Sequence, residues 1–188
     1  MVNSGRPKVF GIGFHKTGTS SLGRALSLLG YRVADVQGVW NEDIAEKAQE
    51  IAFSVVDKFD AFEDNPWPLL YRELDEHYPG SKFILTLRPS DEWIRSVVNH
   101  FGNESTPMRK WIYGVGSPLG NEAVYLNRYG QHNQDVIDYF KGREESLLQM
   151  HITEGDGWDK LCGFLGEPIA GGDFPHTNKA VDLEPRTC

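Results

Sequence analysis

Apolar residues follow two patterns that alternate along the chain. Short runs of consecutive apolar residues are typical of buried strands, whereas apolar residues spaced three and four apart are typical of amphipathic helices. The clearest strand runs from Lys82 to Leu87, where almost every residue is apolar and strand-forming. Strands are also expected over 8–14, 59–62 and 146–152, and helices over 20–29, 41–52, 69–78, the segment from Ser90, 129–143 and the segment from Asp156. This alternation indicates βαβ units around a parallel sheet, which is an α/β fold.

Two segments show neither the strand pattern nor the helix pattern. Residues 100–127 interleave glycines and prolines with aromatic residues, which is typical of a substrate lid or pocket wall, or of ordinary loops with a short helix. Residues 171–188 have no core-forming pattern. Because no repeat or linker divides the 188 residues, we expect a single domain over 1–188.

Composition and charge narrow the classes of partner. Hydrophobic residues make up 39% and charged residues 24%, which is the balance of a folded protein, and the net charge of −8 argues against binding to nucleic acid or anionic membranes. No basic segment followed by an apolar run opens the chain, and no 18 consecutive residues are apolar, so we expect a cytoplasmic protein without a membrane span. Cys162 and Cys188 are expected to be free thiols.

The first strand leads into a glycine-rich loop. Gly13 and Gly18 have the GxxxxG spacing of a P-loop, in which backbone N–H groups and the N-terminus of the next helix face one anion. In nucleotide triphosphatases the next two residues are Lys and then Ser or Thr, the hydroxyl holding Mg²⁺, whereas this chain has Thr19 and Ser20 there. The lysine lies inside the loop, at Lys16. A metal therefore becomes optional, because Lys16 puts a cation beside the bound group.

A second candidate anion site follows the clearest strand. Arg88 lies at the carboxyl end of that strand, next to the crevice that the glycine-rich loop forms. Its guanidinium group suits a phosphate, since it makes several charge-assisted hydrogen bonds at once. The simpler interpretation is a surface salt bridge.

The loop from Phe14 to Leu22 resembles the 5′-phosphosulfate-binding loop of P-loop sulfotransferases, which use 3′-phosphoadenosine 5′-phosphosulfate (PAPS). Arg88 and Ser96 have the eight-residue spacing of that family's 3′-phosphate site. The resemblance covers residue 8 to about 180 and implies a three-layer, doubly wound, P-loop NTPase-like sheet, a C-terminal nucleotide-side loop within 171–188, adenosine 3′,5′-bisphosphate as product and no required metal. The nucleotide-binding residues it implies are Phe14, His15, Lys16, Thr17, Gly18, Thr19, Ser20, Ser21, Arg88, Ser96 and, less closely matched, Lys179.

Sulfuryl transfer needs charge stabilisation on the leaving oxygen and a base for the acceptor. Lys16 is the candidate for the first task. For the base, the family places a His or an acidic residue after the second strand, which is expected here over 59–62. This chain has Glu63-Asp64-Asn65-Pro66 at that point. Asp64 is the first candidate, Glu63 the second and His15 the third; a turn or helix cap is the competing role for Asp64.

Two other functions fit the loop alone. One is a Mg²⁺-dependent small-molecule kinase or other P-loop phosphotransferase, against which the displaced lysine and the Arg88/Ser96 pair both count. The other is a noncatalytic nucleotide-binding module. The acceptor, whether the hydroxyl or amine of a sugar, a lipid headgroup, a phenol or a peptide, and the oligomeric state leave no mark in the sequence.

Overall fold

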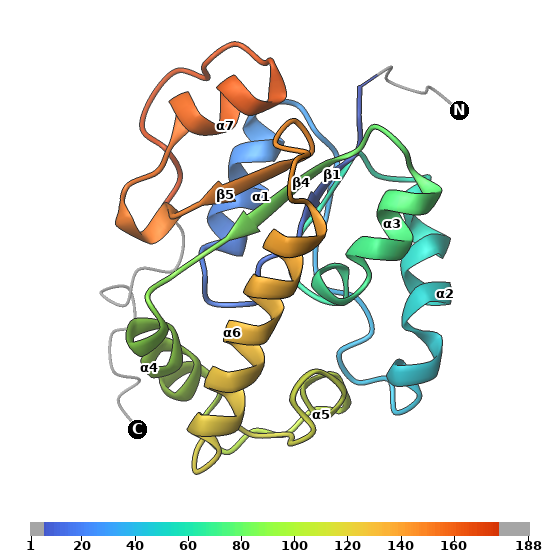
Figure 1. The fold of residues 1–188 in the computed structure, drawn as a ribbon, viewed down its shortest axis with the longest axis vertical. Coiled ribbons are helices and arrows are strands. Elements are labelled where there is room, and N and C mark those ends of the chain that lie inside the picture. Colours follow the sequence, from blue (N-terminus) through green and yellow to red (C-terminus); the bar gives the residue numbers. More distant parts are fainter. Residues whose placement is uncertain (1–5, 177–188) are drawn as a thin grey trace, which may run out of the picture.

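Five short parallel strands form one sheet in the order β2-β3-β1-β4-β5 in the computed structural model, which describes residues 6–176 (Figure 1). The register pairs Val9 with both Ala61 and Lys82, so the central strand has a neighbour on each side. The strands are β1 (Val9–Gly11), β2 (Val33–Ala34), β3 (Ala61–Phe62), β4 (Lys82–Thr86) and β5 (Leu147–Met150).

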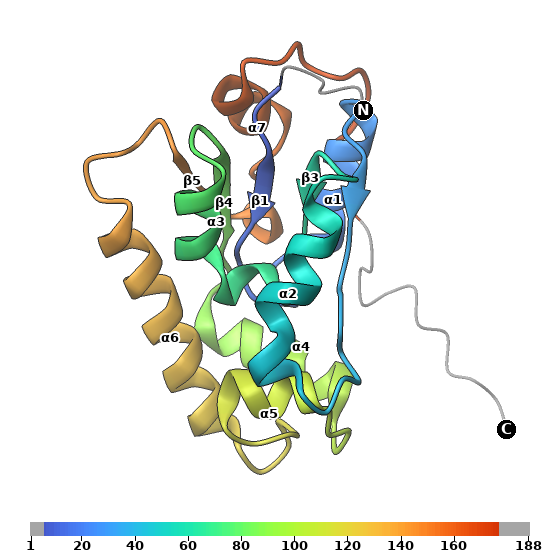
Figure 2. The ribbon, with the colours of Figure 1, turned by 90° about the vertical axis from the view of Figure 1, so that its right-hand side faces the viewer.

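Alternate residues of each strand point to opposite faces of the sheet and build two separate cores. Val9 and Ile84 belong to one core, with helices α1 (Thr19–Leu28) and α7 (Trp158–Leu165). Phe10 and Phe83 belong to the other, with helices drawn from the middle of the chain. Those helices are α2 (Ile44–Val56), α3 (Tyr71–His77), α4 (Ser90–Phe101), α5 (Pro107–Tyr113) and α6 (Glu122–Tyr139). The predicted three-layer, doubly wound α/β fold is therefore confirmed (Figures 1 and 2).

The segment expected to be irregular contains more helix than its composition indicates. Helix α5 begins after Thr106, whose hydroxyl accepts a hydrogen bond from Arg109 N at 3.1 Å. Helix α6 begins at Glu122 and not at the expected Tyr129. Tyr125 and Tyr129 are four residues apart and both buried, so they lie on one face of a single helix. Two short 3₁₀ turns, Trp67–Leu69 and Ile152–Glu154, complete the elements.

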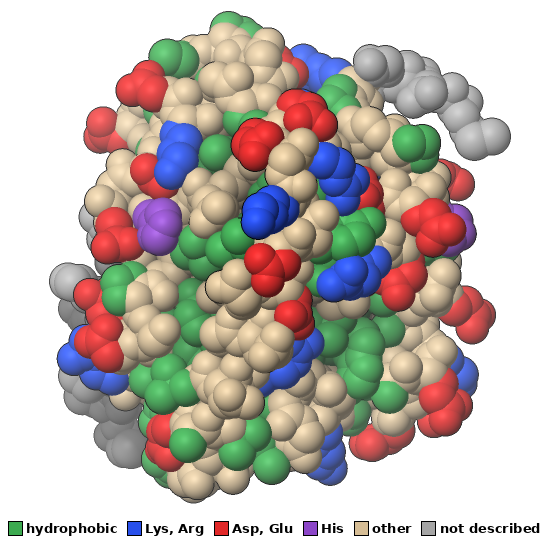
Figure 3. All heavy atoms as spheres, in the orientation of Figure 1, with side chains coloured by type: hydrophobic (Ala, Val, Ile, Leu, Met, Phe, Trp, Pro, Cys, Tyr) green, Lys and Arg blue, Asp and Glu red, His purple; other side chains and the backbone are tan. Residues whose placement is uncertain are grey.

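The charged side chains on the surface and the cysteines do not indicate a particular class of binding partner. On the face drawn in Figure 3, acidic and basic side chains are interspersed. Cys162 is a buried free thiol, while Cys188 lies outside the described residues. Within residues 6–176, every helix is too short or too polar to cross a bilayer.

Candidate active site

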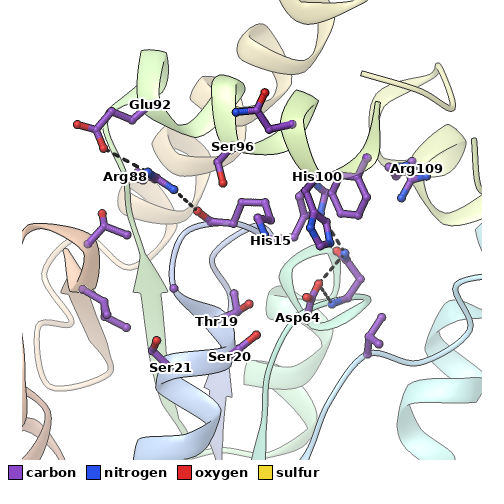
Figure 4. Close-up of a pocket in the computed structure, with 18 of the residues that line it drawn as sticks. His15, Thr19, Ser20, Ser21, Asp64, Arg88, Glu92, Ser96, His100 and Arg109 are labelled. Carbon is purple, nitrogen blue, oxygen red and sulfur yellow. Dashed lines mark hydrogen bonds and ion pairs between the residues drawn. The ribbon is translucent and has the colours of Figure 1, made fainter. Parts of the chain in front are cut away.

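The carboxyl ends of β1, β3 and β4 meet at one edge of the sheet, where the chain reverses the direction in which it adds strands. In such folds this edge is the usual ligand crevice. It brings the glycine-rich loop, Asp64 and Arg88 around one cavity of about 860 Å³ (Figure 4). Residues that are far apart in the sequence thus share one site.

Close packing and unusual backbone angles set the path of the glycine-rich loop. A Cβ at Gly13 would lie 2.1 Å from Thr86 Oγ1, so only glycine fits against β4. Gly18 has a φ of 102°, and a side chain there would also press on Ile152. Lys16 adopts a φ of 66°, which is rare for a residue with a side chain and recurs at functional sites.

Two residues of the loop face the interior and not the cavity. The Thr17 hydroxyl lies 2.6 Å from Phe14 O and 2.6 Å from Thr86 Oγ1, and Phe14 stacks on His132 with ring centroids 4.2 Å apart. His132 Nε2 lies 2.8 Å from Ile12 O, and burial lowers the pKa of His132 to about 4, so the neutral ring donates this bond. The side chains of Phe14 and Thr17 therefore shape the loop from its inner side, and neither residue lines the cavity.

Lys16 is the cation of the loop and lines the cavity. Burial lowers its pKa, the nearby Arg88 lowers it further, and Asp64 opposes both effects. Half-buried cations near one another are stabilised by anions, so this pair favours an anionic ligand. The hydroxyl residues that line the cavity beside Lys16 are Thr19, Ser20 and Ser21.

Arg88 leaves β4 and bends over the same loop. Its Nη1 donates to Lys16 O at 3.5 Å, and its Nε lies 3.4 Å from Glu92 Oε2, both long contacts. Its backbone N–H and carbonyl both bond to the Tyr129 hydroxyl, at 3.0 and 2.9 Å. Ser96 lies one turn after Glu92 on α4 and lines the cavity too. The predicted Arg88/Ser96 pair thus shares one cavity with Lys16 (Figure 4).

Asp64 and His15 are joined through Asn65. Asp64 Oδ1 accepts from the backbone N of Asn65 at 2.8 Å and from its Nδ2 at 2.9 Å. The same Nδ2 lies 3.4 Å from His15 Nδ1, and His15 Nε2 lies 3.0 Å from the Tyr113 hydroxyl. Burial raises the pKa of Asp64 to about 6, against the opposing hydrogen bond from the Asn65 backbone. Asp64, like Lys16, has a positive φ, of 65°.

The His15 ring is buried, and both of its nitrogens have hydrogen-bond partners. Burial, with Arg109, Lys16 and His100 nearby, lowers its pKa to about 3. The ring is therefore neutral, its Nδ1 accepts from Asn65, and its Nε2–H donates to Tyr113.

A family model described as a sulfotransferase domain matches residues 8–122 and 108–183. The chain belongs to the sulfotransferase domain family. It is also 26% identical over 210 residues to "Ava biosynthesis cluster protein M" of Aspergillus versicolor, a match that covers 90% of this chain and 80% of that protein. The first matched segment of the sulfotransferase domain contains the glycine-rich loop, Asp64, Arg88 and Ser96.

Glu63 takes a different direction from Asp64 in this sulfotransferase domain. Its Cγ would lie 3.0 Å from a Cβ at Gly23 of α1, and it lines a separate shallow groove. Burial raises the pKa of Glu63 to about 8, Asp64 raises it further, and a hydrogen bond from Thr19 opposes them. Its Oε2 has no hydrogen-bond partner among the described residues. Glu63 is thus a neutral acid outside the cavity.

Lys179, the least closely matched of the predicted nucleotide-binding residues, lies outside the described residues. His176, which was not predicted as a site residue, lines the cavity. Across residues 6–176, no three His, Cys, Asp or Glu side chains gather as a metal site would require.

Two residues that were not predicted from the sequence, Trp93 and Asn65, contact His15 of the glycine-rich loop. Trp93 Nε1 donates to His15 O at 2.9 Å, and its ring stacks on Tyr129 at 4.1 Å. Asn65 was named only as part of the turn before Pro66. Nothing in the local sequence signals these contacts, because each joins segments far apart in the chain.

Proposed function

We propose that the protein transfers a sulfuryl group from PAPS to a hydroxyl group of an acceptor. The observation that carries this proposal is that Lys16, within the glycine-rich loop, and Arg88 with Ser96 line one cavity. Two cationic centres along one cavity suit a ligand with two separate anionic groups, such as the 5′-phosphosulfate and the 3′-phosphate of PAPS, better than a single phosphate.

The donor set fits this nucleotide. Backbone N–H groups at the start of α1, the hydroxyl of Ser20 and the Lys16 ammonium suit the 5′-phosphosulfate. Arg88 and Ser96 suit the 3′-phosphate. The bound nucleotide would supply an activated sulfuryl group. Lys16 would stabilise the negative charge that develops on the leaving oxygen.

Asp64 is the proposed base. It lines the cavity with Lys16, and its Oδ1 is held by two N–H groups of Asn65. With a pKa of about 6 it is ionised at neutral pH and close enough to that pH to accept a proton effectively. It would take the proton of the acceptor hydroxyl as the O–S bond forms.

His15 would act as a positioning residue. Both ring nitrogens are engaged, and a pKa of about 3 makes the ring a poor base. Its Nδ1 accepts from Asn65 and so orients the amide that holds Asp64. These contacts favour Asp64 over His15 as the base.

A magnesium-dependent phosphotransferase is a poorer match. Such enzymes have Lys and then Ser or Thr directly after the second glycine of the loop, whereas this chain has Thr19 and Ser20 there and its lysine at Lys16.

Thermal unfolding tests the proposal. Adenosine 3′,5′-bisphosphate should raise the melting temperature of the wild type, and should raise that of Arg88→Ala much less, because the variant loses the 3′-phosphate contacts. ATP with Mg²⁺ should stabilise both proteins weakly and equally. Stabilisation of the wild type by ATP with Mg²⁺ alone would contradict the proposal.

A further inference from the structure

The two ends of the cavity differ in their side chains. Figure 4 shows Arg88 and Glu92 at one end and Asp64, His100 and Arg109 at the other, with His15 between them. The first end is the one assigned above to the nucleotide. A volume of about 860 Å³ is near the upper limit for a single small-molecule site, so the second end has room for another molecule.

Apolar side chains wall the second end. Val36 and Val39 come from the segment after β2, Phe101 from the end of α4 and Met108 from α5. A backbone hydrogen bond from Met108 N to Val39 O, at 3.3 Å, joins two of these segments. These walls belong to separate elements that the fold holds together, and they offer apolar contact to a ligand.

The cation at this end is already paired. Arg109 donates from Nε to Gly116 O at 3.0 Å and from Nη2 to Glu104 O at 2.6 Å and Glu104 Oε1 at 2.9 Å. Its guanidinium carbon lies 4.3 Å from the centre of the Phe101 ring. The side chain is nearly buried in these contacts, so its charge is balanced before any ligand arrives.

The other ionisable groups at this end do not favour an anion either. Burial and Lys16 lower the pKa of His100, which is therefore neutral at neutral pH. Asp64 is an anion there. An anionic acceptor would lose its hydration and meet a negative charge without a free cation from the described residues, apart from Lys16, which the sulfuryl group occupies. An aliphatic amine would be drawn to Asp64 as a cation, and a cationic amine has no lone pair for the transfer.

We propose that this end of the cavity binds an uncharged acceptor with an apolar body and one hydroxyl group, a phenol or an apolar alcohol, in preference to sugars, anionic acceptors and amines. The inference rests on the proposed sulfuryl transfer and adds the class of acceptor. The hydroxyl group would face Asp64 while the apolar body lies against Val36, Val39 and Met108. In the transfer, the acceptor oxygen bonds to sulfur, its proton passes to Asp64, and the bond from sulfur to the bridging oxygen breaks, leaving adenosine 3′,5′-bisphosphate.

Two pairs of acceptors test the class, one that differs in charge and one, of two uncharged molecules, that differs in polarity. With labelled PAPS, methyl 4-hydroxybenzoate should be sulfated with a kcat/KM at least about tenfold higher than 4-hydroxybenzoate, and 2-naphthol at least about tenfold higher than methyl glucoside. Equal or reversed preferences would overturn the inference.

A charge placed on the wall gives a matched test. Val36 is 37% exposed, so Val36→Lys should fold and should raise the kcat/KM for 4-hydroxybenzoate relative to its methyl ester by about threefold, the effect of an exposed ion pair. Val124, 42% exposed on α6 and outside the cavity lining, provides the control Val124→Lys, which should leave the ratio unchanged. An equal change in both variants would contradict the assigned wall.

Binding separates the two levels of the proposal. If adenosine 3′,5′-bisphosphate does not bind, the proposed function fails. If it binds but 2-naphthol neither reacts with labelled PAPS nor binds to the protein saturated with adenosine 3′,5′-bisphosphate, the acceptor class is wrong and the nucleotide site stands.

Discussion

Replacing Asn65 with Ala should make Asp64 a harder group to ionise. The Asn65 amide donates to Asp64 Oδ1 at 2.9 Å, and alanine removes that donor while it keeps the backbone N–H at 2.8 Å. A hydrogen bond to a charged group contributes about 1.5–3 kcal/mol, and water entering the vacated space would restore part of it. A net loss of about 1.4 kcal/mol corresponds to one pH unit. The pKa of Asp64, about 6 in the wild type, should therefore rise by roughly that amount.

NMR titration of the Asp64 carboxyl carbon measures this pKa without needing an acceptor. With aspartate labelled at that carbon and Asp64→Asn for assignment, the midpoint should lie higher in Asn65→Ala than in the wild type. Asn103→Ala, an exposed change of the same type, should leave it unchanged. Where turnover is measured, the acidic limb of kcat/KM should move upward by the same amount. A midpoint that stays in place or falls in Asn65→Ala would refute the assigned role of the amide.

Three further predictions follow from the site. Lys16→Met should lower kcat about a hundredfold and weaken the binding of adenosine 3′,5′-bisphosphate much less, by about fivefold, because the ammonium contacts the 5′-phosphate but acts most strongly on charge that develops during transfer. Equal losses in turnover and in the affinity measured by calorimetry would contradict this. Trp93→Phe keeps the stacking on Tyr129 but loses the bond to His15 O, so calorimetry should show about fivefold weaker nucleotide binding, whereas unchanged affinity would show that the loop needs no such support. Glu63→Gln should raise the free energy of unfolding at pH 8, measured in urea, by about 2–4 kcal/mol. Between pH 4.5 and 8 the folded wild type keeps a proton on Glu63 that the unfolded chain releases. The wild type therefore loses stability as the pH rises, and the variant should not. A variant with the wild-type pH dependence would contradict the protonation of Glu63.

Four of the five strands in the described residues, and every helix except α5, could be predicted from the sequence because each depends on neighbouring residues, whereas the two-residue strand β2 was not predicted. The glycine spacing of the loop and the apolar run from Lys82 to Leu87 are local signals. Their convergence at one edge then follows from a parallel sheet, so Arg88 and Lys16 were expected to be neighbours. The start of α6 was missed because residues 122–128 lack a clear apolar period of their own.

The details of the site depend on contacts across the fold. Asp64 and Glu63 are consecutive, and consecutive residues at a strand end point in opposite directions, so periodicity alone did not say which one enters the cavity. The hydrogen bond between Asn65 and His15 joins residues 50 positions apart, and the one between His15 and Tyr113 joins residues 98 positions apart. Such pairings arise only when distant elements pack, and no local pattern contains them.

The 3′-phosphate selectivity of the nucleotide site tests the central claim most directly. By calorimetry, adenosine 3′,5′-bisphosphate should bind the wild type at least about tenfold more tightly than adenosine 5′-monophosphate, which lacks the 3′-phosphate. Arg88→Ala should abolish this difference and leave the affinity for the monophosphate nearly unchanged, while Arg72→Ala, an exposed change of the same type outside the cavity, should preserve the difference. Equal binding of the two nucleotides by the wild type would contradict the account.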